Sequence, residues 1–256
     1  MSKKNSKITE NNTRRLLSFS AGNAKIRTEN TYIFSLPAGY SCPGARDCLA
    51  KCDIDTGRIK DGPEAKYRCY AASQETRPSV RAARWRNYTA LLQVGTVAGM
   101  RDLILESLPT KAKVIRIHES GDFFNQKYFD AWMYVAAYRA DVLFYAYTKS
   151  IPFVNARMGQ IPENFKIVWS SGGRFDDLGR ETSLSKAEVV FYKETAEASG
   201  LPIDHTDEHA RAADHDFALL LHGVQPKGTP AADAMRVGRD ERAYSNKRTP
   251  ETSFSV

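Results

Sequence analysis

The chain has 256 residues, of which 42% are hydrophobic and 26% are charged. This composition is typical of a soluble globular protein and excludes collagen-like, coiled-coil and wholly disordered chains. No segment approaches the roughly 20 consecutive apolar residues that a membrane span needs, and the basic, polar N-terminus lacks the apolar stretch of a secretory signal. We therefore expect a cytoplasmic protein.

The net charge of +7 is distributed unevenly along the chain. Residues 1–100 contain 17 basic and 8 acidic side chains, whereas residues 101–256 contain 20 and 22. A basic segment of this kind suits a nucleic-acid backbone, an anionic cofactor or an anionic metal cluster. Charge alone does not choose among these partners.

Composition also predicts the domain organisation. Residues 1–22 are polar and basic, so we expect a flexible arm there. Residues 236–256 are charged and rich in Ser and Thr, so we expect an extended or disordered polar tail. The remaining residues, 23–235, are enough for a single α/β domain.

Within this domain, helix and strand patterns alternate. Pro78 begins a helical pattern that continues to Leu108 with a break near Gly95, and residues 126–139 form an aromatic-rich amphipathic helix. Strands are predicted in six segments rich in β-branched and aromatic residues: 31–36, 113–118, 142–147, 165–169, 187–192 and 217–221. Strands separated by helices or long connections indicate parallel βαβ units.

Polar side chains gather where these predicted strands end. The carboxyl ends of parallel strands meet at one rim, where the active sites of (β/α) barrels form. The candidates for proton transfer or polar anchoring are His118, Glu119, Asp122, Lys149 and His222. The candidates for cofactor binding are Ser120, Gly121 and Ser170. Strand alternation predicts that Arg116 and His118 lie on the same face of their strand.

All four cysteines lie within 28 positions, after the first predicted strand. They are Cys42, Cys48, Cys52 and Cys69. The alternatives to a metal site are a disulfide framework, which a reducing compartment disfavours, and use as small apolar core residues, which would be scattered. Several thiolates on one short segment favour metal or iron–sulfur ligation.

The segment 37–69 is therefore predicted to hold the metal. Cys48 and Cys52, four positions apart, would point to one centre if a helical turn begins near Asp47. Three flanking cations are expected to lower the pKa of the thiols: Arg46, Lys51 and Arg68. The spacing C-x5-C-x3-C-x16-C lacks the paired C-x2-C of zinc ribbons, so an iron–sulfur cluster is favoured over zinc.

A basic and aromatic stripe is predicted on the helix that begins at Pro78. Its residues recur at helical spacing and are Arg77, Arg81, Arg84 and Tyr88, with Trp85 beside them. Such a stripe suits phosphate contacts and base stacking. The hypothesis for a partner is DNA or RNA bound through the three arginines, and the alternative is a solvated or internally paired helix face.

Several segments resemble a bacteriophage family known as gene product 88. They are 22–26, 34–45, 72–75, 117–123, 147–150 and 221–228. The resemblance extends over about residues 20–235. It implies a phage or mobile-element protein located in the cytoplasm of the host cell, and the family implies little established biochemistry.

The order of the motifs is also distantly similar to radical SAM enzymes, whose partial (β/α)6 barrel carries a three-cysteine loop after its first strand. Here Cys42, Cys48 and Cys52 follow the first predicted strand. The likeness implies a partial TIM-like barrel, a 4Fe-4S cluster on these thiols and S-adenosylmethionine (SAM) as a cofactor. The spacing departs from C-x3-C-x2-C, and Cys69 as a fourth ligand would close the cluster to SAM.

Two hypotheses of different classes follow from these patterns. The first is an iron–sulfur enzyme with a partial barrel that modifies nucleic acid or a nucleotide. The second is a non-enzymatic nucleic-acid-binding protein in which the four thiolates hold a structural zinc. Metal content separates the two.

Overall fold

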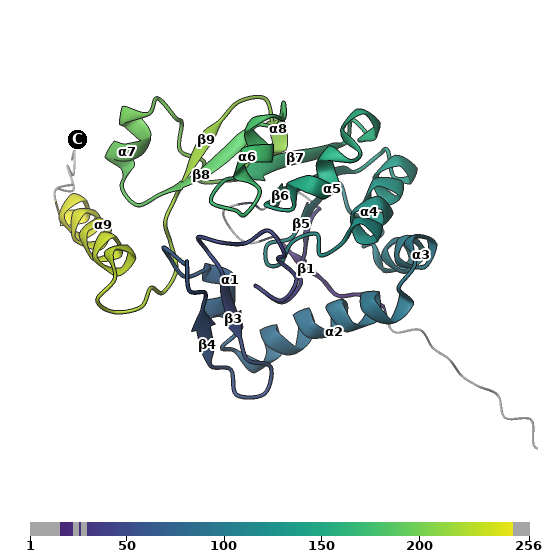
Figure 1. Cartoon of the computed structure of the whole chain (residues 1–256), viewed down its shortest axis with the longest axis horizontal. Coiled ribbons are helices and arrows are strands. Elements are labelled where there is room, and N and C mark those ends of the chain that lie inside the picture. Colours follow the sequence, from purple (N-terminus) through teal and green to yellow (C-terminus); the bar gives the residue numbers. More distant parts are fainter. Residues whose placement is uncertain (1–15, 23–25, 27–29, 248–256) are drawn as a thin grey trace, which may run out of the picture.

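The computed structural model describes residues 16–22, 26 and 30–247. A seven-stranded sheet forms the centre of a mixed α/β structure, and a two-stranded hairpin lies apart from it (Figure 1). In spatial order the sheet strands are β1 (Phe19–Ala21), β2 (Thr31–Phe34), β5 (Val114–Ile117), β6 (Leu143–Thr148), β7 (Phe165–Ser170), β8 (Lys186–Val190) and β9 (Phe217–Leu220). The hairpin strands are β3 (Ala50–Cys52) and β4 (Ile59–Asp61).

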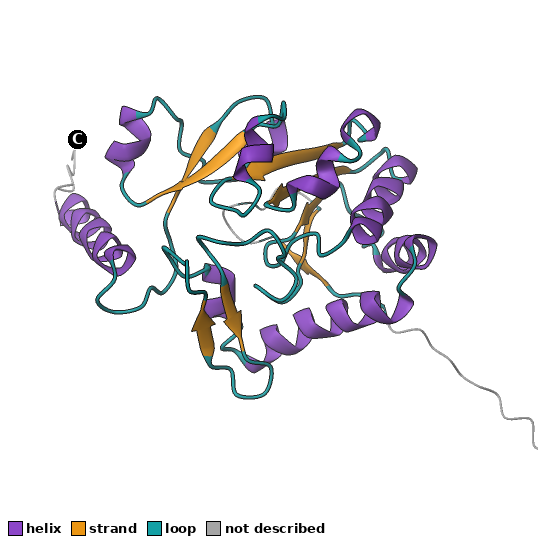
Figure 2. Cartoon of the chain, in the orientation of Figure 1, coloured by secondary structure: helices purple, strands orange, loops and turns teal. Residues whose placement is uncertain are grey.

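The helices of the described residues fall into two groups by length (Figure 2). The longer ones are α2 (Pro78–Val94), α3 (Val97–Ser107), α4 (Gln126–Tyr138) and α9 (Pro230–Lys247). The short ones are α1 (Tyr70–Gln74), α5 (Ile151–Asn155), α6 (Asp176–Arg180), α7 (Lys193–Ala198) and α8 (Glu208–Ala212), with a 3-10 turn at Met158–Gln160. The predicted break near Gly95 is confirmed, since this glycine ends α2 in a left-handed conformation and Thr96 caps α3.

All six predicted strands occur, as β2 and as β5 to β9. They are parallel and follow one another across the sheet in chain order, so the predicted parallel α/β arrangement is confirmed. The strand β1 pairs antiparallel with β2, with Phe19 opposite Phe34. Part of the expected flexible arm is thus a strand, and residues 1–15 lie outside the described residues.

The predicted partial (β/α)6 TIM-like barrel is not shown. The described residues contain the six parallel strands of that prediction, but the sheet is open, with β1 and β9 at its two edges and no described strand joining them. The antiparallel β1 also occupies the outer edge of β2, where a barrel would place a further parallel strand.

The C-terminal region also differs from the expected extended tail. The helix α9 begins at Pro230 and continues to Lys247. Its sequence is rich in Ala and Arg, which are strong helix formers, so this charged segment is helical. The end of the predicted tail, 248–256, lies outside the described residues.

The two faces of the sheet pack against different elements. One face carries Phe34, Ile115 and Phe144 and is covered by α2, α3 and α4, with Trp132 of α4 fully buried against it. On the other face, a smaller cluster that includes Tyr145, Val168 and Phe217 packs against α8. The alternation of side chains along each strand produces this division.

Alternation fails at the end of β5. Arg116 lies on the α8 side, where its guanidinium is 2.6 Å from the Asp207 carboxylate. His118 has a φ of 70°, and its ring contacts Phe123 and Tyr128 on the α4 side instead. The prediction that Arg116 and His118 share a face is wrong, because the chain leaves the extended conformation at His118.

Candidate functional site

The segment between β2 and α1 lies over the carboxyl ends of the parallel strands. The Leu36 amide donates to the Ser120 carbonyl at 2.8 Å, and the Asp47 amide donates to the Gly172 carbonyl at 3.0 Å. Gly44 lies so close to Lys149 that a Cβ on it would be 2.2 Å from the Lys149 carbonyl oxygen. The cysteine segment is therefore held directly against the ends of β5, β6 and β7.

Three of the four cysteines come together at this edge. The thiols of Cys42, Cys48 and Cys69 are close enough that their charges affect one another's pKa values. Cys42 and Cys48 come from the segment that crosses the strand ends, and Cys69 directly precedes α1. All four cysteines of the chain are free thiols.

Burial is the main influence on these thiols. It raises the pKa of Cys42 well above its usual value, raises that of Cys48, and raises that of Cys69 to about 11. The Asp122 carboxylate raises the pKa of Cys42 further, whereas Lys149 lowers that of Cys48. Without a ligand the three thiols are therefore protonated at neutral pH, and a metal would have to displace their protons.

Cys52 belongs to a different environment. It ends β3, so the helical turn that would align it with Cys48 does not form. Its side chain is buried, and its charged neighbours are Glu75, Arg81 and Asp53 rather than the other thiols. The structure thus groups Cys69, instead of Cys52, with Cys42 and Cys48.

The three flanking cations also point elsewhere. Arg46 pairs with Asp47 and Asp176, and Arg68 pairs with Asp61. Lys51 lies over the Tyr40 ring at 5.1 Å. The prediction that these cations lower the thiol pKa values is therefore wrong. The basic groups that act on the thiols are Lys149 and Arg84, which come from distant parts of the sequence.

Lys149 and Asp122 are the buried charges beside the thiols. The Lys149 ammonium donates to the carbonyl and hydroxyl oxygens of Ser170, both at 3.0 Å, and to the Ser171 carbonyl. The Asp122 carboxylate accepts from the Thr148 hydroxyl at 2.5 Å and from the Lys149 backbone amide at 2.9 Å. These bonds tie the ends of β5, β6 and β7 together around the thiols.

The other predicted rim residues have diverse positions. Ser120 is buried and its hydroxyl donates to Glu75, while Gly121 packs against Leu36 and Ser41 with a φ of 90°. Glu119 lies 3.8 Å from Arg84. The exposed His222 ring packs at a tilt of 32° against Tyr70, with 4.4 Å between the ring centroids.

His118 is fully enclosed. Its Nε2 lies 3.0 Å from the Tyr128 hydroxyl, and burial lowers its pKa to about 3. The imidazole is therefore neutral at physiological pH. No described contact joins it to the thiols.

The arginines of the predicted nucleic-acid stripe are mostly engaged within the protein. Arg81 donates to the carbonyl oxygens of Ile54 and Glu75, and Arg84 pairs with the Glu75 carboxylate at 3.0 Å. Both are buried, whereas Arg77 is exposed. The alternative of an internally paired helix face therefore describes Arg81 and Arg84.

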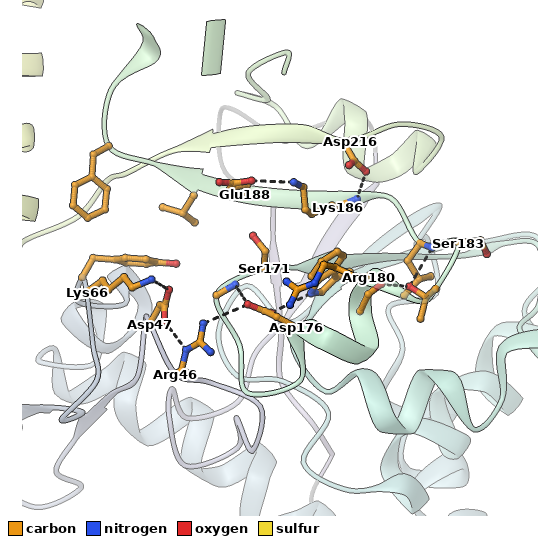
Figure 3. Close-up of a pocket in the computed structure, with 18 residues that line it drawn as sticks. Arg46, Asp47, Lys66, Ser171, Asp176, Arg180, Ser183, Lys186, Glu188 and Asp216 are labelled. Atoms are coloured by element: carbon orange, nitrogen blue, oxygen red, sulfur yellow. Dashed lines mark hydrogen bonds and ion pairs between the residues drawn. The ribbon is translucent and has the colours of Figure 1, made fainter. Parts of the chain in front are cut away.

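A charged cleft of about 730 Å³ opens beside the cysteine segment (Figure 3). One wall carries a chain of ion pairs in which Lys66 and Arg46 both contact Asp47 at 2.8 Å. The opposite wall carries Lys186, whose ammonium is 3.0 Å from the Glu188 carboxylate. Its lining thus presents both signs of charge to a ligand.

Tyr67 is one of the cleft residues that belong to the cysteine segment. It lines the cleft, and its ring makes an edge contact with Phe191 at 6.1 Å. Burial, with Cys48 and Cys69 beside it, raises the pKa of its phenol well above the usual value. Sequence reasoning missed the cleft because its residues are spread over the cysteine segment, the end of β7, α6 and β8 and form no motif; the Ser-Ser-Gly-Gly run at the end of β7 was the available signal.

The fold and site define a class of protein: an α/β protein with three partly buried free thiols at the carboxyl edge of a parallel sheet and a charged cleft beside them. A profile of the family described as Gene product 88 matches residues 2–243, and the chain belongs to this family. The predicted phage family is thereby confirmed.

Two relatives come from mycobacteriophages. The chain is 29% identical over 207 residues to the Gene 88 protein of Mycobacterium phage L5, which covers 76% of this chain and 80% of the relative. It is 27% identical over 188 residues to the Gene 88 protein of Mycobacterium phage D29, with coverage of 70% and 71%. No solved structure matches, and the likeness to radical SAM enzymes finds no support.

Two further findings concern the described part of the chain. None of its helices combines the length and the apolar character needed to cross a bilayer. No group of three or more His, Cys, Asp or Glu side chains there is arranged to hold a single metal ion. The thiol cluster is therefore described by its mutual proximity and its burial.

Proposed function

We propose that the protein binds a 4Fe-4S cluster through Cys42, Cys48 and Cys69. The observation that carries the proposal is that these three free thiols, each partly buried, lie near enough to one another at one edge of the sheet to interact electrostatically. Thiolate is the usual protein ligand of iron–sulfur clusters. Cys52, predicted as a ligand from its spacing, is left out of the proposed set because it contacts other groups.

The chemistry of the donors favours a cluster over a zinc ion. Thiolates on one tetrahedral zinc lie about 3.8 Å apart, given Zn–S bonds of about 2.3 Å. Thiolates that bind different irons of a cluster lie farther apart. No group of described residues has the arrangement of a single-ion site, which counts against zinc. The all-thiol donor set is what favours a cluster.

Lys149 adds a second support. It is 7% exposed, and no carboxylate lies within ion-pair distance of its ammonium among the described residues. A buried charge is costly unless it is paired. Thiolates formed on metal binding would supply the missing negative charge, and Arg84 would assist at Cys69.

The cleft provides a place for a substrate beside this centre. When bound, a cluster supplies one-electron chemistry. Tyr67 lines the cleft and also lies near the thiols. Three protein ligands leave one iron of four without a protein ligand, so SAM is a candidate cofactor there. Nucleic acid or a nucleotide is the proposed class of substrate, from the basic N-terminal part of the chain.

Anaerobic purification followed by metal analysis tests the proposal. Wild-type protein should be brown and contain about four irons with matching sulfide per chain. Cys42→Ala, Cys48→Ala and Cys69→Ala should each lose most of the iron, whereas Cys52→Ala, the matched control, should retain it. Colourless protein with one zinc and no iron would favour the structural zinc alternative. A visible spectrum that changes on addition of SAM would support the open iron.

A further inference from the structure

The hairpin carries an unfavourable pair of lysines. Its register places Lys51 of β3 directly opposite Lys60 of β4, and both side chains are exposed. Like charges directly opposite each other destabilise a strand pair. Neither lysine forms an ion pair with another described residue, so their repulsion is not offset by a carboxylate. Lys51 lies instead over the Tyr40 ring. The arrangement is therefore suited to a partner that brings negative charge.

A row of four aromatic rings begins at Tyr40, the ring over which Lys51 lies. Tyr40, which is 36% exposed, contacts Trp85 with 4.9 Å between ring centroids. Trp85 contacts Tyr88 at 5.9 Å, and Tyr88 contacts Phe124 at 5.1 Å. The last three rings are partly exposed. We call the two lysines and these four rings the basic-aromatic surface.

This surface is held in a fixed shape. The hairpin turn is closed by Asp53, whose carboxylate accepts from the Thr56 amide at 2.7 Å and the Thr56 hydroxyl at 2.8 Å. The buried Arg81 of α2 donates to the Ile54 carbonyl in the same turn at 2.8 Å. The hairpin lies beside the N-terminal end of α2 (Figure 1), where the exposed Arg77 adds a further positive charge.

The basic-aromatic surface is distinct from the charged cleft. The charged cleft lies elsewhere on the cysteine segment, since none of the four rings lines it.

We propose that the basic-aromatic surface binds single-stranded nucleic acid. Lys51, Lys60 and Arg77 would contact phosphates, and unpaired bases would stack on Tyr40 and its neighbouring rings. A single strand is the partner because base faces are free for stacking, whereas in a duplex they are covered. The proposal is independent of whether the thiols hold a metal. Binding is therefore measured on the full chain, and the metal content of the same preparation is determined separately.

Fluorescence anisotropy with a labelled oligothymidylate of about 20 nucleotides tests the phosphate contacts, since binding sites of this type span about 4–16 nucleotides. Lys51→Ala with Lys60→Ala should weaken binding about tenfold. It should also reduce the slope of log affinity against log salt by about 1.4, or about 0.7 for each lost phosphate contact. Lys111→Ala with Lys113→Ala is the matched control, since these exposed lysines directly precede β5 at the opposite end of the strands.

Tyr40→Ala tests stacking separately. It should weaken binding about five- to hundredfold while leaving the salt slope unchanged, because it removes a ring and no charge. Tyr40→Phe should restore most of the affinity, which separates stacking from loss of structure. Absence of binding by the wild-type chain, or equal binding by the paired lysine variant and its control, would overturn the proposal. Duplex DNA that binds as tightly as the single strand would overturn the single-strand assignment.

Discussion

Two buried cations of the sheet, Arg116 and Lys149, have their charges satisfied in different ways. The Arg116 guanidinium lies 2.6 Å from the Asp207 carboxylate, and that carboxylate also accepts hydrogen bonds from Tyr145 at 2.9 Å and Tyr147 at 3.1 Å. The Lys149 ammonium instead has neutral oxygens of Ser170 and Ser171 as its acceptors. The Arg116 charge therefore has a counter-ion, whereas the Lys149 charge has none among the described residues.

The difference separates a structural group from a candidate binding group. A buried cation that is paired with a carboxylate needs no further counter-charge. A buried cation beside three thiols gains a counter-charge when those thiols lose their protons. Both groups lie on neighbouring strands of one sheet, so burial and fold do not account for the contrast. The candidate binding groups therefore lie at the carboxyl edge of the sheet rather than on the face covered by α8.

The largest effect on stability is expected at the Arg116–Asp207 ion pair. Asp207→Asn should lower the free energy of unfolding by about 3–5 kcal/mol, because it leaves the Arg116 charge buried without a counter-ion. Asparagine tolerates the left-handed backbone at this position, where φ is 57°, so the loss reports on charge. Urea denaturation measures the change. Asp55→Asn, in an exposed turn, is the control and should change stability by less than about 0.5 kcal/mol.

His118 represents a third arrangement, a buried group that stays neutral. Its pKa is lowered by burial to about 3, compared with about 6.5 in an unfolded chain. Its contribution to stability is therefore complete above about pH 6.5 and is lost as the pH falls towards 3, reaching about 2 kcal/mol of loss at pH 5. His118→Leu should remove this part of the pH dependence in denaturation experiments. An imidazole NMR signal that titrates near pH 6.5 would contradict the assignment.

The smallest effect on stability is expected at Lys149. Lys149→Met removes hydrogen bonds but also relieves a buried charge, so metal-free protein should change by only about 1 kcal/mol. Retention of iron should fall clearly, since the counter-charge of the thiolates is lost. A loss of stability as large as that of Asp207→Asn, with iron unchanged, would mean that Lys149 is structural and that the contrast drawn above is mistaken.

Local patterns predicted the sheet well. The six parallel strands and the position of the cysteine segment followed from β-rich segments and from the rule that parallel strands end at one edge. The grouping of the thiols did not follow from spacing, since β3 takes Cys52 away and the chain brings Cys69 back before α1. Likewise, helical spacing predicted a stripe of arginines, but the partners that bury Arg81 and Arg84 come from other segments.

The coverage of the two sheet edges affects whether copies of the chain associate through their strands. An unpaired strand edge is a template for further strands and promotes aggregation. At one side the three-residue β1 covers β2, and at the other the segment around Ile203 bridges to Ala218 of β9 through two backbone hydrogen bonds, of 2.8 and 2.9 Å. A chain shortened to begin after Ala21 would uncover the hydrogen-bonding edge of β2 and should self-associate through it. By occupying these edges, β1 and the segment around Ile203 should therefore prevent edge-to-edge polymerisation of the sheet.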